Sequence, residues 1–246
     1  MRSGGIRNTK VELQMKLNRN TEVESLQVSP PDAKPMLPAV PSSVVYNEDC
    51  VEGLKRFSDK HFDLAIVDPP YGLGKRTTDG GSKKNTQTKF MDDIRRSNWD
   101  DNVPTAEYWE QLFRVSKNQI VWGGNHFGLP AHRTFIVWDK MTYVPTMSQI
   151  EQAWTSFDSP ARLYKINSNN TNRIHPTEKP VALYKRLLNE YAKEGDLILD
   201  THLGSGANRI ACAEMGFSFV GFELDKVYYE KQEKRFKDFV SQLRMF

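Results

Sequence analysis

Residues 62–72, Phe-Asp-Leu-Ala-Ile-Val-Asp-Pro-Pro-Tyr-Gly, decide how the rest of the chain is read. The apolar run 64–67 has the length and composition of a buried strand in a parallel sheet. The strand must end at Asp68, because Pro69 and Pro70 fix φ and remove two backbone donors. A carboxylate, unpaired prolyl carbonyls and the ring of Tyr71 can accept two hydrogens from an exocyclic amine and stack on its ring. This describes a pocket for an extruded nucleobase, and the alternative is a rigid turn after a strand.

Length and composition limit the class of protein. A chain of 246 residues is long enough for one α/β domain with appendages. The formal net charge of +3 is only mildly basic, so any nucleic-acid surface must be local. Two cysteines, Cys50 and Cys212, exclude a disulfide scaffold and a cysteine zinc site, and the five histidines show no metal-ligand spacing. No apolar run reaches the length of a membrane span or signal sequence, so we expect a cytoplasmic, nucleoid-associated protein without a membrane partner.

Apolar runs and helical patterns alternate along the chain. Residues 1–41 are polar and rich in proline, which predicts a disordered N-terminal arm before a domain over 42–246. A doubly wound, mostly parallel sheet is expected, with a late antiparallel strand pair where no long helix intervenes. The strands are predicted at 44–46, 64–67, 119–122, 134–139, 152–157, 197–199 and 217–223. The helices are predicted at about 50–57, 105–116, 177–191, 207–215 and 225–243, with Thr105 and Thr177 as caps.

Four of the predicted strands are followed by acids. They are followed by Asp49, Asp68, Asp200 and Glu223, and the carboxyl ends of parallel strands form one ligand-binding edge. After Asp200, Gly204 and Gly206 form a glycine-rich turn into a helix, but Arg209 stands where a dinucleotide fingerprint has a third glycine. Glu223 is placed to accept the two hydroxyls of a ribose, and a nearby carboxylate favours a cationic group. S-adenosylmethionine fits this pattern, since it has a ribose, a sulfonium and an amine but no pyrophosphate.

Two basic segments are candidate DNA-contacting surfaces. The first, over 73–104, is long, flexible in composition and beside the proposed base pocket, and the second, over 158–175, mixes basic residues with asparagines. An ordinary solvated loop is the alternative for each. The basic candidates are Lys75, Arg76, Lys83, Lys84, Arg95, Arg96, Arg162, Lys165 and Arg173.

Three motifs in one order give the chain a family resemblance over about 44–240. The tetrapeptide Asp68-Pro69-Pro70-Tyr71 comes first, then His-Pro-Thr-Glu-Lys-Pro at 175–180, then Asp-Thr-His-Leu-Gly-Ser-Gly at 200–206. This resembles the β-group of S-adenosylmethionine-dependent DNA amino-methyltransferases, in which the catalytic motif precedes the cofactor motif. The resemblance implies a Rossmann-like class I methyltransferase fold with a circularly permuted motif order. The Asp-Pro-Pro-Tyr form goes mostly with adenine N6 and the Ser form more often with cytosine N4.

The resemblance also implies roles for single residues. Asp68, Pro69, Pro70 and Tyr71 would be catalytic, holding and stacking a flipped adenine. The cofactor would be held by Asp49, Thr177, Lys179, Asp200, His202, Gly204, Ser205, Gly206 and Glu223. His202 stands where the group often has Phe, so the packing near the sulfonium differs.

The function expected from these motifs is methyl transfer from S-adenosylmethionine to adenine N6 in double-stranded DNA. The family also suggests a homodimer and a cognate restriction nuclease as partners. Cytosine N4, adenine in RNA and a protein glutamine are other amines for the same chemistry. A non-catalytic DNA-binding subunit that retains the fold is the alternative from another class.

Overall fold

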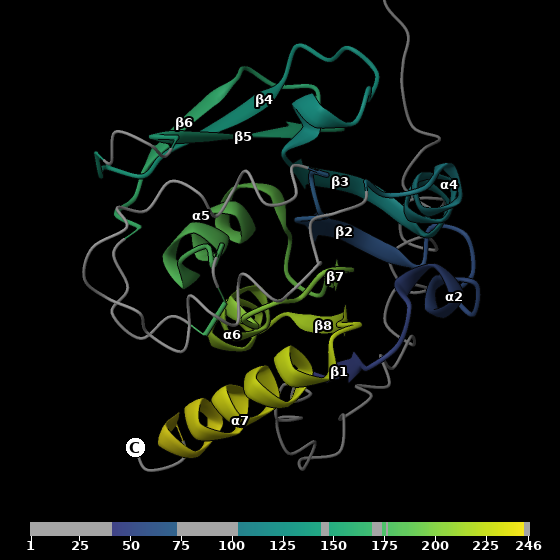
Figure 1. The fold of residues 1–246 in the computed structure, drawn as a ribbon, viewed down its shortest axis with the longest axis vertical. Coiled ribbons are helices and arrows are strands. Elements are labelled where there is room, and N and C mark those ends of the chain that lie inside the picture. Colours follow the sequence, from purple (N-terminus) through teal and green to yellow (C-terminus); the bar gives the residue numbers. More distant parts are fainter. Residues whose placement is uncertain (1–40, 73–102, 144–147, 169–173, 176, 244–246) are drawn as a thin grey trace, which may run out of the picture. The chain divides into compact units, whose positions relative to one another are not determined.

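The computed structural model describes residues 41–72, 103–143, 148–168, 174–175 and 177–243. They contain an eight-stranded sheet in the order β1-β8-β7-β2-β3-β5-β4-β6 (Figure 1). The strands are β1 (Ser43–Tyr46), β2 (Phe62–Val67), β3 (Ser116–Trp122), β4 (Phe135–Asp139), β5 (Ile150–Thr155), β6 (Arg162–Lys165), β7 (Leu197–Asp200) and β8 (Ser218–Phe222). The helices are α2 (Cys50–Leu54), α4 (Ala106–Val115), α5 (Val181–Tyr191), α6 (Ala207–Met215) and α7 (Lys226–Leu243), with a 3-10 turn η2 (Gly124–His126).

Strand direction confirms the predicted sheet. β1, β8, β7, β2 and β3 are parallel neighbours, and β5 runs antiparallel to both β3 and β4. Because β1, β8, β7 and β2 are consecutive in the sheet, the acids that follow or end them meet along one edge. The prediction that these acids converge is therefore confirmed by the topology.

Helices cover both faces of the sheet (Figure 1). On one face, α5 and α6 pack over a core that includes Ile66, Trp122 and Ile198, and on the other α2 and α4 pack over Ala65 and Val67. Successive strand residues point to opposite faces, so a strand covered on both faces must be apolar throughout. This is why the run 64–67 has no polar residue.

Several element boundaries differ from the prediction. The first helix ends at Leu54 instead of about 57, because the chain continues in tighter turns with hydrogen bonds from Arg56 N to Gly53 O and from Phe57 N to Leu54 O. Thr105 caps α4 as predicted, through Tyr108 N.

Thr177 is not the cap of α5, so this prediction was wrong. Pro180 takes the cap position and the helix begins at Val181. The Thr177 hydroxyl instead lies 3.2 Å from Nδ1 of His175.

Strand β6 was not predicted, because residues 162–165 were read as part of a DNA-contacting segment. Only Tyr164 of this strand is buried, and the strand lies at the end of the sheet beside β4. An edge strand with one buried side chain carries little apolar pattern. The N-terminal arm and the segment 73–102 lie outside the described residues, and the predicted domain boundaries stay predictions. Within the described residues, no helix is long and apolar enough to span a membrane.

Arg209, which replaces the third glycine of a dinucleotide fingerprint, is a buried structural residue. Its guanidinium donates to Glu233 at 2.5 Å, to Gln232 at 2.9 Å and to the Ser43 hydroxyl at 2.9 Å. It also lies 3.8 Å over the ring of Phe236. Arg209 thus joins α6 to α7 and to β1.

We predict that Arg209→Met lowers the free energy of unfolding by about 3 kcal/mol, because Gln232 and Glu233 lose their buried partner while the apolar stem is retained. Urea denaturation measures the change. Lys234→Met is the control, since its ion pair with Asp238 is exposed and contributes less than about 0.5 kcal/mol. Equal losses in the two variants would contradict the structural role of Arg209.

Candidate functional site

One cavity of about 540 Å³ opens at the carboxyl edge of β1, β8, β7 and β2. Asp68, which follows β2, and Glu223, which follows β8, both line it. Residues of the predicted catalytic motif and of the predicted cofactor motif therefore line one cavity. The predicted residues in its wall are Asp49, Asp68, Pro70, Thr177, His202, Gly204, Ser205 and Glu223.

The described wall of this cavity is acidic. It contains no Lys or Arg, and its six carboxyl groups belong to Glu48, Asp49, Asp68, Glu178, Glu223 and Asp225. Glu48 pairs with Arg56, and Glu178 pairs with Arg235. Asp68 contacts Lys179, and the remaining three, Asp49, Glu223 and Asp225, leave the cavity with a negative potential that favours a cationic ligand.

Two histidines in the wall add no positive charge near pH 7. Burial lowers the pKa of His202 to about 4, and burial together with the charge of Lys179 lowers the pKa of His175 to about 4. His202 packs edge-on against Tyr108, and His175 packs edge-on against Tyr228. Both imidazoles are therefore uncharged parts of the cavity wall. At position 202 the imidazole packs against an aromatic ring, that of Tyr108.

The glycine-rich turn brings backbone to the cavity. Gly204 has φ +52°, and a Cβ there would lie 3.5 Å from the His175 ring. Its N–H donates to Oε2 of Glu223 at 2.8 Å, while Oε1 accepts from Asp225 N at 2.9 Å. Burial raises the pKa of Glu223, whereas these backbone donors oppose the rise. Glu223 is thus held rigidly and still has lone pairs for two further donors.

Three predicted cofactor residues do not line the cavity. Asp200 is buried and accepts hydrogen bonds from Asn208 and from His202 N, and burial raises the pKa of Asp200 to about 7. Gly206, at φ +74°, begins α6 and packs against Gln232. Asp200 and Gly206 therefore belong to the turn and its hydrogen bonds but do not line the cavity. Lys179 lies elsewhere, against the catalytic motif.

The Lys179 ammonium contacts the Asp68 carboxylate and lies 3.0 Å from Oε2 of Glu151. Its side chain is 2% exposed. Burial alone would lower the pKa of Lys179, but the two carboxylates raise it above its ordinary value, so the ammonium stays charged. The resemblance implied a cofactor-binding role for Lys179, whereas its observed partners are Asp68 of the Asp-Pro-Pro-Tyr motif and Glu151 of β5.

Tyr71 completes the environment of Asp68. Its hydroxyl donates to Oδ1 of Asp68 at 2.7 Å, and burial followed by the charge of Asp68 raises the Tyr71 pKa well above its ordinary value. The Tyr71 ring stacks on His126 with centroids 5.0 Å apart and an interplanar angle of 18°. A Cβ at Gly123 would lie 2.2 Å from the Tyr71 ring, so only glycine leaves room for it. Neither Tyr71 nor Pro69 lines the cavity itself.

Sequence reasoning missed several residues of the site. Glu151 carries no local motif and lies on β5, far along the chain from 68 and 179. Tyr184 and Tyr228 line the cavity from α5 and α7, where they read as ordinary core residues of amphipathic helices. Among the described residues no group of His, Cys, Asp and Glu has the arrangement of a metal site.

Most of the predicted DNA-binding residues lie outside the described part of the chain. Arg162 and Lys165 are exposed on β6, and Arg162 pairs with Glu190. Lys75, Arg76, Lys83, Lys84, Arg95, Arg96 and Arg173 lie outside the described residues.

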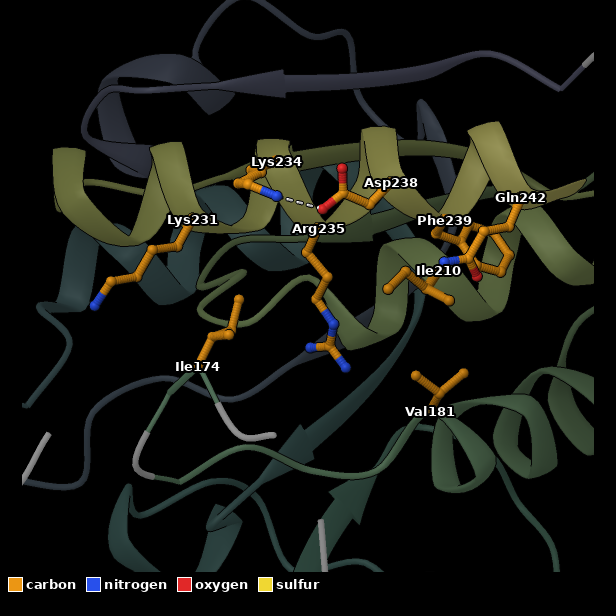
Figure 2. A pocket seen from close by; sticks show the side chains of 9 residues that line it. All are labelled: Ile174, Val181, Ile210, Lys231, Lys234, Arg235, Asp238, Phe239 and Gln242. Carbon is orange, nitrogen blue, oxygen red and sulfur yellow. Dashed lines mark hydrogen bonds and ion pairs between the residues drawn. The ribbon is translucent and has the colours of Figure 1, made fainter. Parts of the chain in front are cut away.

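A second hollow of about 520 Å³ lies along α7 and contains none of the predicted residues (Figure 2). Arg235 points into it from α7, opposite Ile174 and Val181 (Figure 2). Its guanidinium donates to Ser205 O at 2.9 Å and pairs with Glu178 at 3.0 Å. Arg235 therefore supports two parts of the acidic cavity wall from outside.

Comparisons with known proteins agree with this geometry. Residues 130–234 match the model of a DNA methylase family. This range contains the motifs at 175–180 and 200–206 and Glu223, but not Asp68. The type II methyltransferase M.HpaI of Haemophilus parainfluenzae is 24% identical over 225 residues, covering 76% of this chain and 72% of that protein. M2.MboI of Moraxella bovis is 22% identical, covering 81% and 89%.

Solved structures support the same fold. The PvuII DNA methyltransferase, described as cytosine-N4-specific, aligns with a TM-score of 0.56 at 15% identity, covering 79% of this chain and 86% of that one. M1.HpyAVI, solved with S-adenosylmethionine, aligns with a TM-score of 0.50 at 20% identity, covering 78% and 99%. The chain is thus similar to N6/N4 DNA methylases over residues 130–234, and to type II methyltransferases over three quarters or more of its length.

Proposed function

We propose that the protein transfers a methyl group from S-adenosylmethionine to the N6 amine of an adenine swung out of double-stranded DNA. Similarity to DNA methylases supports the general part of this proposal, a DNA methyltransferase that uses this cofactor, and adenine as the target is the finer part. The observation that carries the proposal is the single cavity joining Asp68 to Gly204 and Glu223. Adenine is favoured over cytosine because the catalytic tetrapeptide begins with Asp68, where the cytosine form more often has serine.

The cavity fits the cofactor in volume and charge. Ligand pockets typically measure about 300–1,000 Å³, and 540 Å³ lies within this range. A wall with carboxylates and neutral histidines suits a ligand with a sulfonium and an amine. Gly204 leaves the backbone open to close approach, and Glu223 is placed for the ribose hydroxyls. When bound, the cofactor supplies an electrophilic methyl group.

The chain's own residues make the amine reactive. An adenine amine is a weak nucleophile, because its lone pair is delocalised into the ring. The Asp68 carboxylate and the Pro69 carbonyl would accept its two hydrogens, which favours a tetrahedral nitrogen and stabilises the growing positive charge. The Tyr71 ring would stack on the flipped base in place of the His126 imidazole that stacks on it in the structure. Tyr71 also orients Asp68 through its hydroxyl.

DNA contacts and partners remain proposals. Lys75, Arg76, Lys83, Lys84, Arg95 and Arg96 would bind phosphates beside the cavity, and Arg162, Lys165 and Arg173 would form a second contact. Lys165 ends a strand parallel to β4, which places it at the same sheet edge as the cavity. A homodimer and a cognate nuclease are the partners that the family suggests.

Product analysis tests the proposed target. PCR-amplified genomic DNA, which carries no methyl groups, is incubated with the protein and S-adenosylmethionine, digested and analysed as nucleosides by mass spectrometry. We expect N6-methyldeoxyadenosine. Detection of N4-methyldeoxycytidine would show that the target is cytosine instead of adenine. Methyl groups found only on added RNA or protein would contradict DNA as the substrate. Cofactor binding by calorimetry without any methyl transfer would favour a non-catalytic subunit.

Asp68→Ala should lower the turnover number by about 10²- to 10³-fold, the scale of losing one preorganised polar contact. Cofactor affinity should change little, because Glu223 and the glycine turn are untouched. Radiolabelled methyl transfer and calorimetry measure the two quantities. Asp59→Ala is the control, since the Asp59 side chain is 77% exposed and pairs with Arg114 away from the cavity. Near-normal methylation by Asp68→Ala would refute its assignment.

Glu223→Gln should weaken S-adenosylmethionine binding about 10- to 100-fold, because charge-assisted hydrogen bonds to two hydroxyls are each replaced by weaker ones. Calorimetry gives the dissociation constant. Glu230→Gln is the matched change on the exposed side of α7 and should have no effect. An unchanged dissociation constant for Glu223→Gln would remove the ribose role.

A further inference from the structure

Four charged side chains form an alternating row behind the catalytic motif. The order is Asp68, Lys179, Glu151 and Lys140, with Glu151 Oε1 2.7 Å from Lys140 Nζ. They come from the end of β2, the segment before α5, strand β5 and the residue after β4. Only Lys179 and Asp68 belong to motifs recognised in the sequence. Glu151 connects these motifs to the antiparallel part of the sheet.

Lys179 presents an electrostatic problem for the proposed chemistry. Its ammonium is buried, lies 5.2 Å over the Trp122 ring and contacts the carboxylate that must accept a hydrogen from the amine. A full positive charge at this position opposes the positive charge that develops on the amine during methyl transfer. Asp68 and Lys179 alone would have no net charge.

Glu151 offsets the positive charge of Lys179. Its side chain is 21% exposed, and Lys179 and Lys140 lower its pKa although burial raises it, so the carboxylate is ionised at neutral pH. Asp68, Lys179 and Glu151 together have a net charge of −1. Lys140 pairs with the other carboxylate oxygen of Glu151 and brings the row of four to zero, but Lys179 is the cation that contacts Asp68.

We propose that Glu151 is a positioning residue for methyl transfer: it holds the Lys179 ammonium and offsets its charge, so that Asp68 keeps the orientation and potential that the amine requires. This inference rests on the proposed methyl transfer at Asp68. It does not depend on whether the target is adenine or cytosine, because both amines would use the same carboxylate.

The test is Glu151→Gln, which keeps the shape and removes the charge. Single-turnover transfer of labelled methyl from S-adenosylmethionine to PCR-amplified genomic DNA should slow by about 10- to 100-fold, the scale of a small misplacement at the reacting centre. The dissociation constant for the cofactor should stay close to that of the wild type, and the variant should remain folded at the assay temperature because Lys179 keeps its contact with Asp68. Glu151→Asp should recover part of the rate. The matched control is Glu214→Gln on α6, which breaks the outer ion pair with Lys185 of α5.

A double-mutant cycle separates positioning from packing. If Glu151 acts by offsetting Lys179, then Glu151→Gln should cause no further loss of rate in a Lys179→Met background. A single-turnover rate of Glu151→Gln within threefold of the wild type would overturn the inference. A rate loss that merely parallels lower stability and weaker cofactor binding would also overturn it, because that is the result of a structural role. Absence of methyl transfer by the wild type would reject the proposed function itself and is read from the same assay.

Discussion

The arrangement of the site depends on one constraint, the parallel pairing of four neighbouring strands. β1, β8, β7 and β2 end at the same edge of the sheet although they come from the beginning and the end of the described chain. Parallel strands require crossovers, and here the helices of these crossovers cover both faces, so the strand residues beneath them are apolar. Polar side chains lie near the two ends of the strands, such as Asp63 near the start of β2 and the acids at the carboxyl edge. The acidic cavity follows from this geometry.

Buried charge is the second organising feature. A lone ammonium as deeply buried as that of Lys179 would be neutralised or excluded, since the cost of desolvation is large. Its partners are therefore fixed parts of the fold: a carboxylate after β2 and another on β5. The same argument applies to Arg209, which replaces a glycine of a common fingerprint and binds α7 instead of a ligand. In both cases an ion pair connects elements that are distant in the sequence.

The sequence predicted those features that depend on local chemistry. The strand ending at Asp68, the turn at Gly204 and the acid at Glu223 each have a short signal, and the structure brings them to one cavity. It did not predict the partners of Lys179, because residues 68, 151 and 179 meet only through the order of the strands. Strand β6 was missed because a short edge strand has one buried residue, and the start of α5 was misplaced because a hydroxyl near a helix has other possible partners. The roles of the individual site residues stay predictions.

The contact between Gly123 and the Tyr71 ring limits which substitutions can alter the surroundings of that ring. The ring lies directly against main chain, and the adjoining peptide is fixed by a hydrogen bond from Gly123 N to Gln152 O on β5. A peptide plane has no rotamers, so this side of the ring cannot be reshaped by exchanging one amino acid for another. The His126 imidazole, which stacks on the ring, is by contrast a replaceable side chain. Diversification of this ring's surroundings among related chains should therefore be concentrated on the imidazole side.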